Sequence, residues 1–243
     1  MATYYTPRII TNGLVLCLDA ANRKSYTSGS TIWYDLSGNN LNAALSGSFP
    51  PTFSSNQSLL FGGASSYAAV PDSTTLRFSG NFSMAVWCYA TSTPTQDARI
   101  ISKDYSGASQ PYISYGFNPN SGLRSGQLVM ELGTVAGNTA AGIYNLTTNE
   151  TLPLNTWRYL TGTLNASTGT AKIYVNGVLK NTGTGTGGGI AYYSNWNFNV
   201  GGLPERSGNY FPGYISQTSL YNIELSPDQV LQNYNATRTR YGI

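Results

Sequence analysis

The sequence predicts an all-β protein, an antiparallel two-sheet sandwich of the jelly-roll type with one short helix near its carboxyl end. Short runs of alternating apolar and polar residues recur along the 243 residues, with Gly, Pro, Asn and Ser between them, and this pattern is typical of strands joined by tight turns. Only 9% of the residues are charged, well below the roughly 25% of an ordinary soluble domain. Because a sandwich of this kind commonly spans about 200 to 250 residues, we expect one domain at residues 13–243, preceded by an arm at residues 1–12.

The clearest strands lie between Thr156 and Lys180. In the run 157–164, aromatic and threonine side chains alternate with leucines, which is the two-residue period of a strand. Turn-forming residues follow, and Asn176-Gly177 is the strongest short signal for a two-residue type I′ hairpin. We therefore expect three consecutive antiparallel strands here.

The other strands are expected from the same alternation. The run 82–89 is apolar on both sides, so we expect it to be central and covered on both faces. The remaining expected strands lie at 13–19, 58–61, 67–70, 98–103, 112–117, 127–132, 197–200 and 211–222.

The helix begins near residue 226. Ser226 suits the N-cap, Pro227 the first helical position and Gln229 the return bond of a capping box. The side chains expected to dock this helix on the sandwich are Val230, Leu231 and Tyr234.

Composition excludes several classes of site. The chain has no histidine, so Ser-His-Asp triads and His-ligated zinc sites are excluded. Its net charge of +3 arises from 13 basic and 10 acidic residues without runs, so we expect neither a nucleic-acid nor a membrane partner. The start lacks a signal peptide, and no apolar run approaches the roughly 18 residues of a membrane span. Synthesis in a cytoplasm is therefore expected.

The two cysteines and two tryptophans lie in apolar runs. Cys17 and Cys88 are expected to be buried free thiols, with a disulfide between them as the alternative. Trp87 and Trp157 are expected in the core because they lie in central strands.

Catalysis by paired carboxylates has little support in the sequence. A retaining glycoside hydrolase needs two carboxyl groups about 5 to 5.5 Å apart, and acids two or four residues apart on one strand would provide this. The ten acids of this chain are isolated from one another. We therefore expect no catalytic residues, with a pair assembled from different strands as the alternative.

Calcium is the one metal that the residues suggest, and no cofactor is expected to be required. The weak candidate ligands are Asp35, Ser37, Asn39, Asp72 and Asp104. Asp, Asn and Ser are also the residues that cap turns, and we favour that interpretation over calcium binding.

Aromatic residues near loops are candidates for an exposed patch that binds a glycan or a partner protein. They are Tyr192, Tyr193, Trp196, Tyr210 and Phe211. Aromatic side chains suit both kinds of ligand, and packing beneath a loop is the alternative.

An ordered set of short motifs gives the chain a family resemblance. The motifs lie at 13–20, 35–39, 60–63, 82–87, 155–157, 172–177, 211–215 and 220–226. In this order they resemble the laminin-G-like or concanavalin A-like lectin jelly-roll domains. The resemblance implies two curved antiparallel sheets with ligands at the rim loops or on the concave face. Some members of that family bind glycans through calcium, some are enzymes and some join proteins.

The variant in which the chain begins almost at once with this domain and closes with the run 229–236 resembles virion proteins of tailed bacteriophages. This resemblance implies a non-enzymatic virion protein, made in the host cytoplasm, which decorates the capsid or belongs to the tail. Its partners would be phage shell or tail proteins and further copies of itself in a homo-oligomer, and it would adhere to glycans. The alternatives are a tail adhesin that binds a host receptor or glycan, and a glycoside hydrolase.

Overall fold

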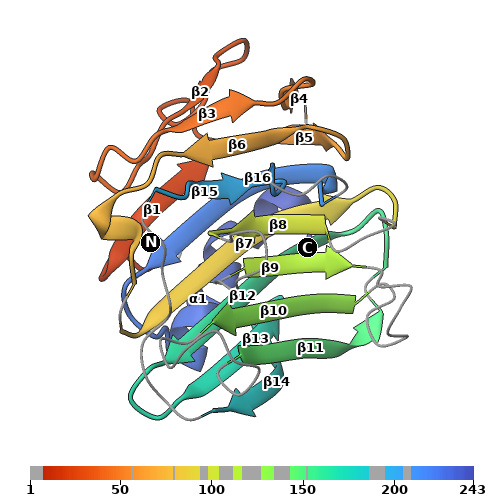
Figure 1. The fold of residues 1–243 in the computed structure, drawn as a ribbon. Coiled ribbons are helices and arrows are strands. Elements are labelled where there is room, and N and C mark those ends of the chain that lie inside the picture. Colours follow the sequence, from red (N-terminus) through yellow and green to blue (C-terminus); the bar gives the residue numbers. More distant parts are fainter. Residues whose placement is uncertain are drawn as a thin grey trace, which may run out of the picture.

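The structure, a computed structural model, describes residues 8–55, 57–78, 80–93, 98–103, 112–116, 127–133, 143–151, 153–185, 195–204 and 209–243. Within these residues the chain forms two antiparallel sheets that pack face to face, with one short helix near the carboxyl end. This is the concanavalin A-like jelly-roll sandwich that the sequence predicts. Figure 1 looks onto one sheet, with the other behind it.

The described strands are divided equally between the sheets. Sheet A contains, in spatial order, β14 (Val178–Thr184), β13 (Thr170–Val175), β12 (Trp157–Asn165), β7 (Phe82–Ala90), β16 (Pro212–Tyr221), β5 (Ser58–Gly62) and β4 (Thr52–Ser54), with β1 (Leu14–Asp19) paired to β16. Sheet B contains β11 (Ile143–Thr151), β10 (Gln127–Gly133), β9 (Tyr112–Gly116), β8 (Ala98–Ser102), β15 (Phe198–Val200), β6 (Tyr67–Val70), β3 (Ala43–Ser46) and β2 (Ile32–Trp33).

The long strand β16 joins three neighbours. Residues 212–215 pair with β5, residues 217–221 pair with β1, and β7 pairs along the opposite edge. The register of the pairing between β16 and β7 shifts between Ile215 and Gln217. At the same residues, the neighbour on the other edge of β16 changes from β5 to β1. The first and last strands of the sandwich thus lie side by side in the middle of sheet A.

The main core lies between the two sheets. Alternation gives each strand one inward face, as in β7, where Phe82, Met84 and Val86 are buried. Other core residues are Leu16, Leu18, Trp33, Leu59, Phe61, Val70, Ile100, Ile101, Leu160, Leu164, Ile173, Phe198, Val200, Phe211 and Ile215.

The hairpins between Thr156 and Lys180 are confirmed. Val175 pairs with Val178, and Asn176 and Gly177 between them both have positive φ angles of 52° and 79°, as a type I′ turn requires. The Asn176 side chain also accepts a hydrogen bond from the Tyr159 amide at 2.9 Å.

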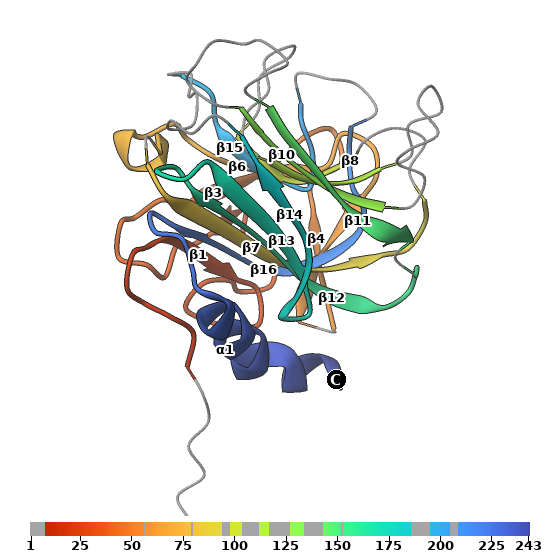
Figure 2. The ribbon, with the colours of Figure 1, turned by 90° about the horizontal axis from the view of Figure 1, so that it is seen from below.

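The carboxyl-terminal helix α1 (Pro227–Thr237) and the turn η3 (Arg238–Tyr241) cover the outer face of sheet A, away from sheet B (Figure 2). The expected capping box is present: Ser226 Oγ accepts from the Gln229 amide, and the Gln229 side chain accepts from the Ser226 amide. Val230 is fully buried, but Leu231, which we expected to dock, remains 43% exposed. Helical rotation places Asn233 and Thr237 in the contact instead.

An aromatic cluster lies between α1, η3 and sheet A. The rings of Trp87 and Tyr241 are 4.2 Å apart between centroids, and those of Trp157 and Tyr241 are 4.6 Å apart. The Trp87 indole N–H donates to Thr237 Oγ1 at 2.7 Å. The expected core position is confirmed for Trp87, which is fully buried, and Trp157 is partly buried beside it. Their cluster is a second core, beneath the carboxyl-terminal segment and not between the two sheets.

Both cysteines are buried and free. Burial raises the pKa of the Cys17 thiol and of the Cys88 thiol to about 12, so both are neutral S–H groups at physiological pH. Within the described ranges, no helix has the length and apolar character needed to cross a membrane.

Candidate functional site

A pocket of about 460 Å³ lies between the loop that follows β1 and the hairpin of β4 and β5. This volume lies within the range of small-molecule sites, which is about 300 to 1,000 Å³. Its lining residues are Ala20, Ala21, Arg23, Tyr26, Thr27, Ser28, Phe53 and Gln57.

Two stacked aromatic rings form one wall of this pocket. The centroids of Tyr26 and Phe53 are 5.4 Å apart, and the ring planes differ by 29°. Tyr26 is buried and its hydroxyl donates to the Ser30 carbonyl at 2.9 Å; burial raises the pKa of this phenol. Phe53 is 37% exposed. A fixed ring thus supports a second ring that solvent can reach.

The loop that carries Tyr26 is held by its own backbone. The Asn22 carbonyl accepts the amides of Ser25 and Tyr26 at 2.8 and 2.9 Å, and Ser25 Oγ accepts the Asp19 amide at 3.0 Å. These bonds fix the tyrosine at the end of β1.

Polar side chains surround the aromatic wall. Arg23, Thr27, Ser28 and Gln57 are all exposed. Gln57 has a positive φ angle of 60°, and its carbonyl accepts from Ser216 Oγ at 2.9 Å. An apolar wall with several donors and acceptors at its edge suits a ligand with one apolar face and several hydroxyl groups.

The aromatic candidates from the sequence do not form this site. Tyr192 and Tyr193 lie outside the described residues. Trp196 is partly exposed, and Tyr210 is half-buried beside Tyr67 with a centroid distance of 6.3 Å. Phe211 is fully buried in the core because its side chain points between the sheets at the start of β16, so the exposed position expected for it is wrong.

The calcium candidate Asp35 has both carboxylate oxygens occupied. Oδ1 accepts from the amides of Cys17 and Ser37 at 2.9 Å each, and Oδ2 accepts from Ser37 Oγ at 2.7 Å and from the Leu41 amide at 3.1 Å. The Asn39 side-chain amide donates to the Val15 carbonyl at 2.8 Å, and Ser37 Oγ lies 2.8 Å from the same carbonyl. This geometry supports the turn-capping interpretation, because a carboxylate offers about four acceptor sites.

Asp72 is held in a second, separate set of contacts. Lys103 Nζ lies 2.6 Å from Oδ1, the Asn195 amide donates to Oδ2 at 2.8 Å, and Arg77 forms an ion pair with Oδ2. Burial alone would raise the pKa of Asp72, but the bonds from Arg77, Lys103 and Asn195 outweigh it and hold that pKa well below its usual range. Asp104 lies outside the described residues. Among described residues, no three acidic or cysteine side chains form a group suited to a metal ion.

Two further carboxylates have structural partners. Asp19 pairs with Arg240 at 2.7 Å, and Glu224 pairs with Lys172 at 2.9 Å. A catalytic acid needs a raised pKa, whereas that of Asp72 is lowered. The described carboxylates thus give no positive support for catalysis.

Solved structures with the same fold come from enzymes and from toxins. The chain matches domain 4 of AbnA, an extracellular arabinanase of Geobacillus stearothermophilus in complex with arabinotriose, at 20% identity and a TM-score of 0.66, covering 91% of this chain and 98% of that one. It matches the receptor binding domain of botulinum neurotoxin C/D mosaic serotype at 17% identity and a TM-score of 0.67, covering 93% of this chain and 51% of that one. It also matches the sialidase of Trypanosoma rangeli in complex with sialic acid at 15% identity and a TM-score of 0.63, covering 94% of this chain and 33% of that one.

These identities establish a shared fold, and the chain spans about half of the toxin domain and a third of the sialidase. Comparison with curated protein sequences gives no match. A family match, described as Laminin_G_3, covers residues 61–231, which is more than half of the chain and includes strands of both sheets. The chain therefore belongs to the Concanavalin A-like lectin/glucanases superfamily.

Proposed function

We propose that this chain is a non-catalytic carbohydrate-binding module that takes a sugar in the pocket formed by Tyr26 and Phe53. The observation that carries the proposal is the exposed Phe53 ring, stacked on a buried tyrosine inside a pocket edged by polar side chains. A pyranose ring has an apolar C–H face and a rim of hydroxyl groups. The apolar face would lie on Phe53, and Arg23 and Gln57 would bond to the hydroxyls.

Relatives with the same fold support carbohydrate as the ligand class to test. The AbnA domain was solved with arabinotriose, and the binding domain of botulinum neurotoxin DC was solved with SialylT. These sugars are ligands of the related proteins. For this chain, the shared fold makes saccharides the first class of polar ligand to test.

A phage particle is the proposed setting. It is supported by the resemblance to virion proteins of tailed phages of a jelly-roll domain that closes with the run 229–236. There the module would dock on shell or tail proteins, self-associate and present the pocket to glycans, either as a decoration protein or as a tail adhesin. Mass spectrometry of purified particles tests this setting, and absence of the protein would contradict it.

Phe53→Ala should weaken binding of the best glycan from an array by roughly fivefold, because an aromatic contact contributes on the order of 1 kcal/mol. Isothermal titration calorimetry measures the change. Phe49→Ala is the matched control, because Phe49 is 69% exposed and lies outside the pocket lining. Equal affinities of the two variants would contradict the proposal, as would an array on which no glycan binds.

A further inference from the structure

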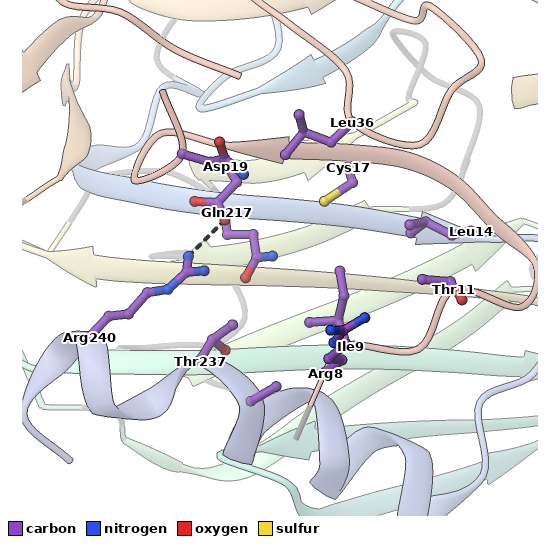
Figure 3. Close-up of a pocket in the computed structure, with 12 residues that line it drawn as sticks. Arg8, Ile9, Thr11, Leu14, Cys17, Asp19, Leu36, Gln217, Thr237 and Arg240 are labelled. Atoms are coloured by element: carbon purple, nitrogen blue, oxygen red, sulfur yellow. Dashed lines mark hydrogen bonds and ion pairs between the residues drawn. The ribbon is translucent and has the colours of Figure 1, made fainter. Parts of the chain in front are cut away.

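A second cavity, also of about 460 Å³, lies on the outer face of sheet A beneath the carboxyl-terminal segment. Its floor comes from β1 and β16, its roof from the end of α1 and from η3, and one side from residues 8–11. Figure 3 shows Gln217 projecting from β16 into the space, with Arg240 on one side of it and Arg8 and Ile9 on the other. Three segments far apart in sequence thus enclose one space.

The segments around this cavity are tied to one another. The Ile10 amide donates to Asn233 Oδ1 at 2.7 Å, and Gln232 donates to the Arg8 carbonyl at 2.8 Å. Arg240 Nη1 reaches Asp19 Oδ2 at 2.7 Å. These bonds fix the distance between floor and roof and keep the cavity open in the folded protein.

The cavity is too large for a simple packing defect, and its mostly apolar lining also carries polar and charged groups. A liquid water occupies about 30 Å³, so the volume suits a small organic molecule. Apolar side chains such as Ile9, Leu14 and Leu36 line part of it. Gln217 contributes a carboxamide that is 4% exposed and lies beside the Cys17 thiol.

The charge of the lining is positive. The single acid, Asp19, is balanced by Arg240, and its other oxygen accepts the Ala21 amide at 3.0 Å. Arg8 forms no side-chain hydrogen bond or ion pair with the part of the chain that the structure describes. Cys17 adds no negative charge, because burial keeps its thiol protonated. Arg8 is exposed, so one guanidinium charge without an acidic partner lies at the solvent-facing edge of the cavity.

We infer that this cavity binds a small organic anion, with its carboxylate or phosphate at Arg8 and its body over Gln217, Leu14 and Leu36. A guanidinium group presents paired donors that match either anion. The Gln217 carboxamide supplies a further donor. The site is separate from the sugar pocket of the proposed function and does not depend on it.

Three probes of similar size, none of them a sugar, distinguish the chemistries: cyclohexanecarboxylate, cyclohexyl phosphate and cyclohexanol. Calorimetry on the full chain should show binding of at least one charged probe and none of cyclohexanol. Binding of cyclohexanecarboxylate alone would indicate a carboxylate ligand, and binding of cyclohexyl phosphate alone a phosphate ligand. Equal binding of cyclohexanol, or no binding of either charged probe, would overturn the inference.

Variants locate the site. Arg8→Gln should weaken binding of the charged probe at least tenfold, whereas Arg23→Gln, at an exposed arginine of the other pocket, should leave it unchanged. Ala236→Phe, which fills the cavity, should also abolish binding. Unchanged affinity in Arg8→Gln would overturn the inference. Phe53→Ala should keep anion binding and Arg8→Gln should keep glycan binding, so failure of either proposal is separable from the other.

Discussion

The carboxylate of Asp35 joins three parts of the chain. It accepts backbone amides from Cys17 on β1 and from Ser37 and Leu41 in the following turn. The sequence indicates a turn here, because Asp, Ser, Gly and Asn follow one another. The long-range bond to β1 could not be predicted, because sequence spacing does not show which strand lies beside a turn.

Asp35→Asn should lower the free energy of unfolding by about 2 kcal/mol, because the amide NH2 replaces an acceptor and leaves buried donors unpaired. Urea denaturation measures this, with and without calcium. Turn capping predicts the same loss in both conditions, whereas a loss seen only with calcium would show that Asp35 binds the ion. Asp228→Asn, at an exposed acid in the first turn of α1, is the control.

The sugar pocket shows where residue-level prediction fails. Tyr26 lies in a loop and Phe53 in a three-residue strand, β4, that the sequence does not reveal. Their stacking depends on the tertiary placement of a hairpin against a loop. No local pattern carries that information.

At the scale of elements, most strands were predictable. The strands β7, β12 and β13 have clear patterns because most of their residues are buried. β14 is largely exposed, and the Asn176-Gly177 turn before it is what predicts it. The strands β2, β3, β4 and β11 were missed, because they are short or rich in polar residues. β4 and β11 end the spatial order of their sheets, and a strand with one neighbour needs less apolar patterning.

The start of α1 was predictable from its capping box. The face of α1 that docks on the sheet was predictable only in part. Val230 fits the apolar pattern, whereas Asn233 and Thr237 contribute through hydrogen bonds. Asn233 accepts from the Ile10 amide and donates to the Tyr221 hydroxyl at 3.1 Å. Their i, i+3 and i+7 spacing with Val230 was the signal available in the sequence.

Asn233→Ala should lower the free energy of unfolding by about 2 kcal/mol, because two buried groups lose their partner. It should also speed hydrogen exchange at the Ile10 amide. Asn235→Ala on the same helix is the matched control, because Asn235 is less buried. Similar exchange at Ile10 in both variants would contradict this role.

At the scale of the molecule, the sequence predicted two sheets and one helix but not what lies outside them. Sheet B covers one face of sheet A, and α1 covers the other (Figure 2). Alternation on β7 indicates that both faces are covered. It does not tell which element covers each, since that depends on how the carboxyl-terminal segment folds back.

The ion-pair network of Asp72 should make the free energy of unfolding depend on pH in the acidic range. The lowered pKa of Asp72 means that its contribution is present above the unfolded value of about 3.9 and is lost as pH falls below it. Burial lowers the pKa of Lys103 although Asp72 opposes this. Removing the carboxylate therefore leaves a buried amine whose remaining hydrogen bond is to the Trp196 carbonyl, with no acid to balance its charge. Asp72→Asn should therefore reduce the free energy of unfolding at pH 7 by about 3 kcal/mol.

Urea denaturation at pH 7 and at pH 2 tests this expectation. The difference between Asp72→Asn and the unmodified protein should shrink at the lower pH, because Asp72 is then protonated in the unfolded chain and folding must release that proton. Asp228→Asn should show no such convergence, because that acid is exposed. A constant difference across the pH range would show that the ion pairs are not its cause.

The aromatic cluster beneath α1 gives the protein a built-in optical reporter. Trp87 touches Tyr234 and Tyr241 and bonds to Thr237, so its surroundings change whenever the carboxyl-terminal segment leaves the sheet. Its emission and the near-ultraviolet dichroism of the coupled rings should follow that release without any attached dye. Undocking of the segment can thus be timed separately from opening of the sandwich, whose interior holds a different tryptophan, Trp33.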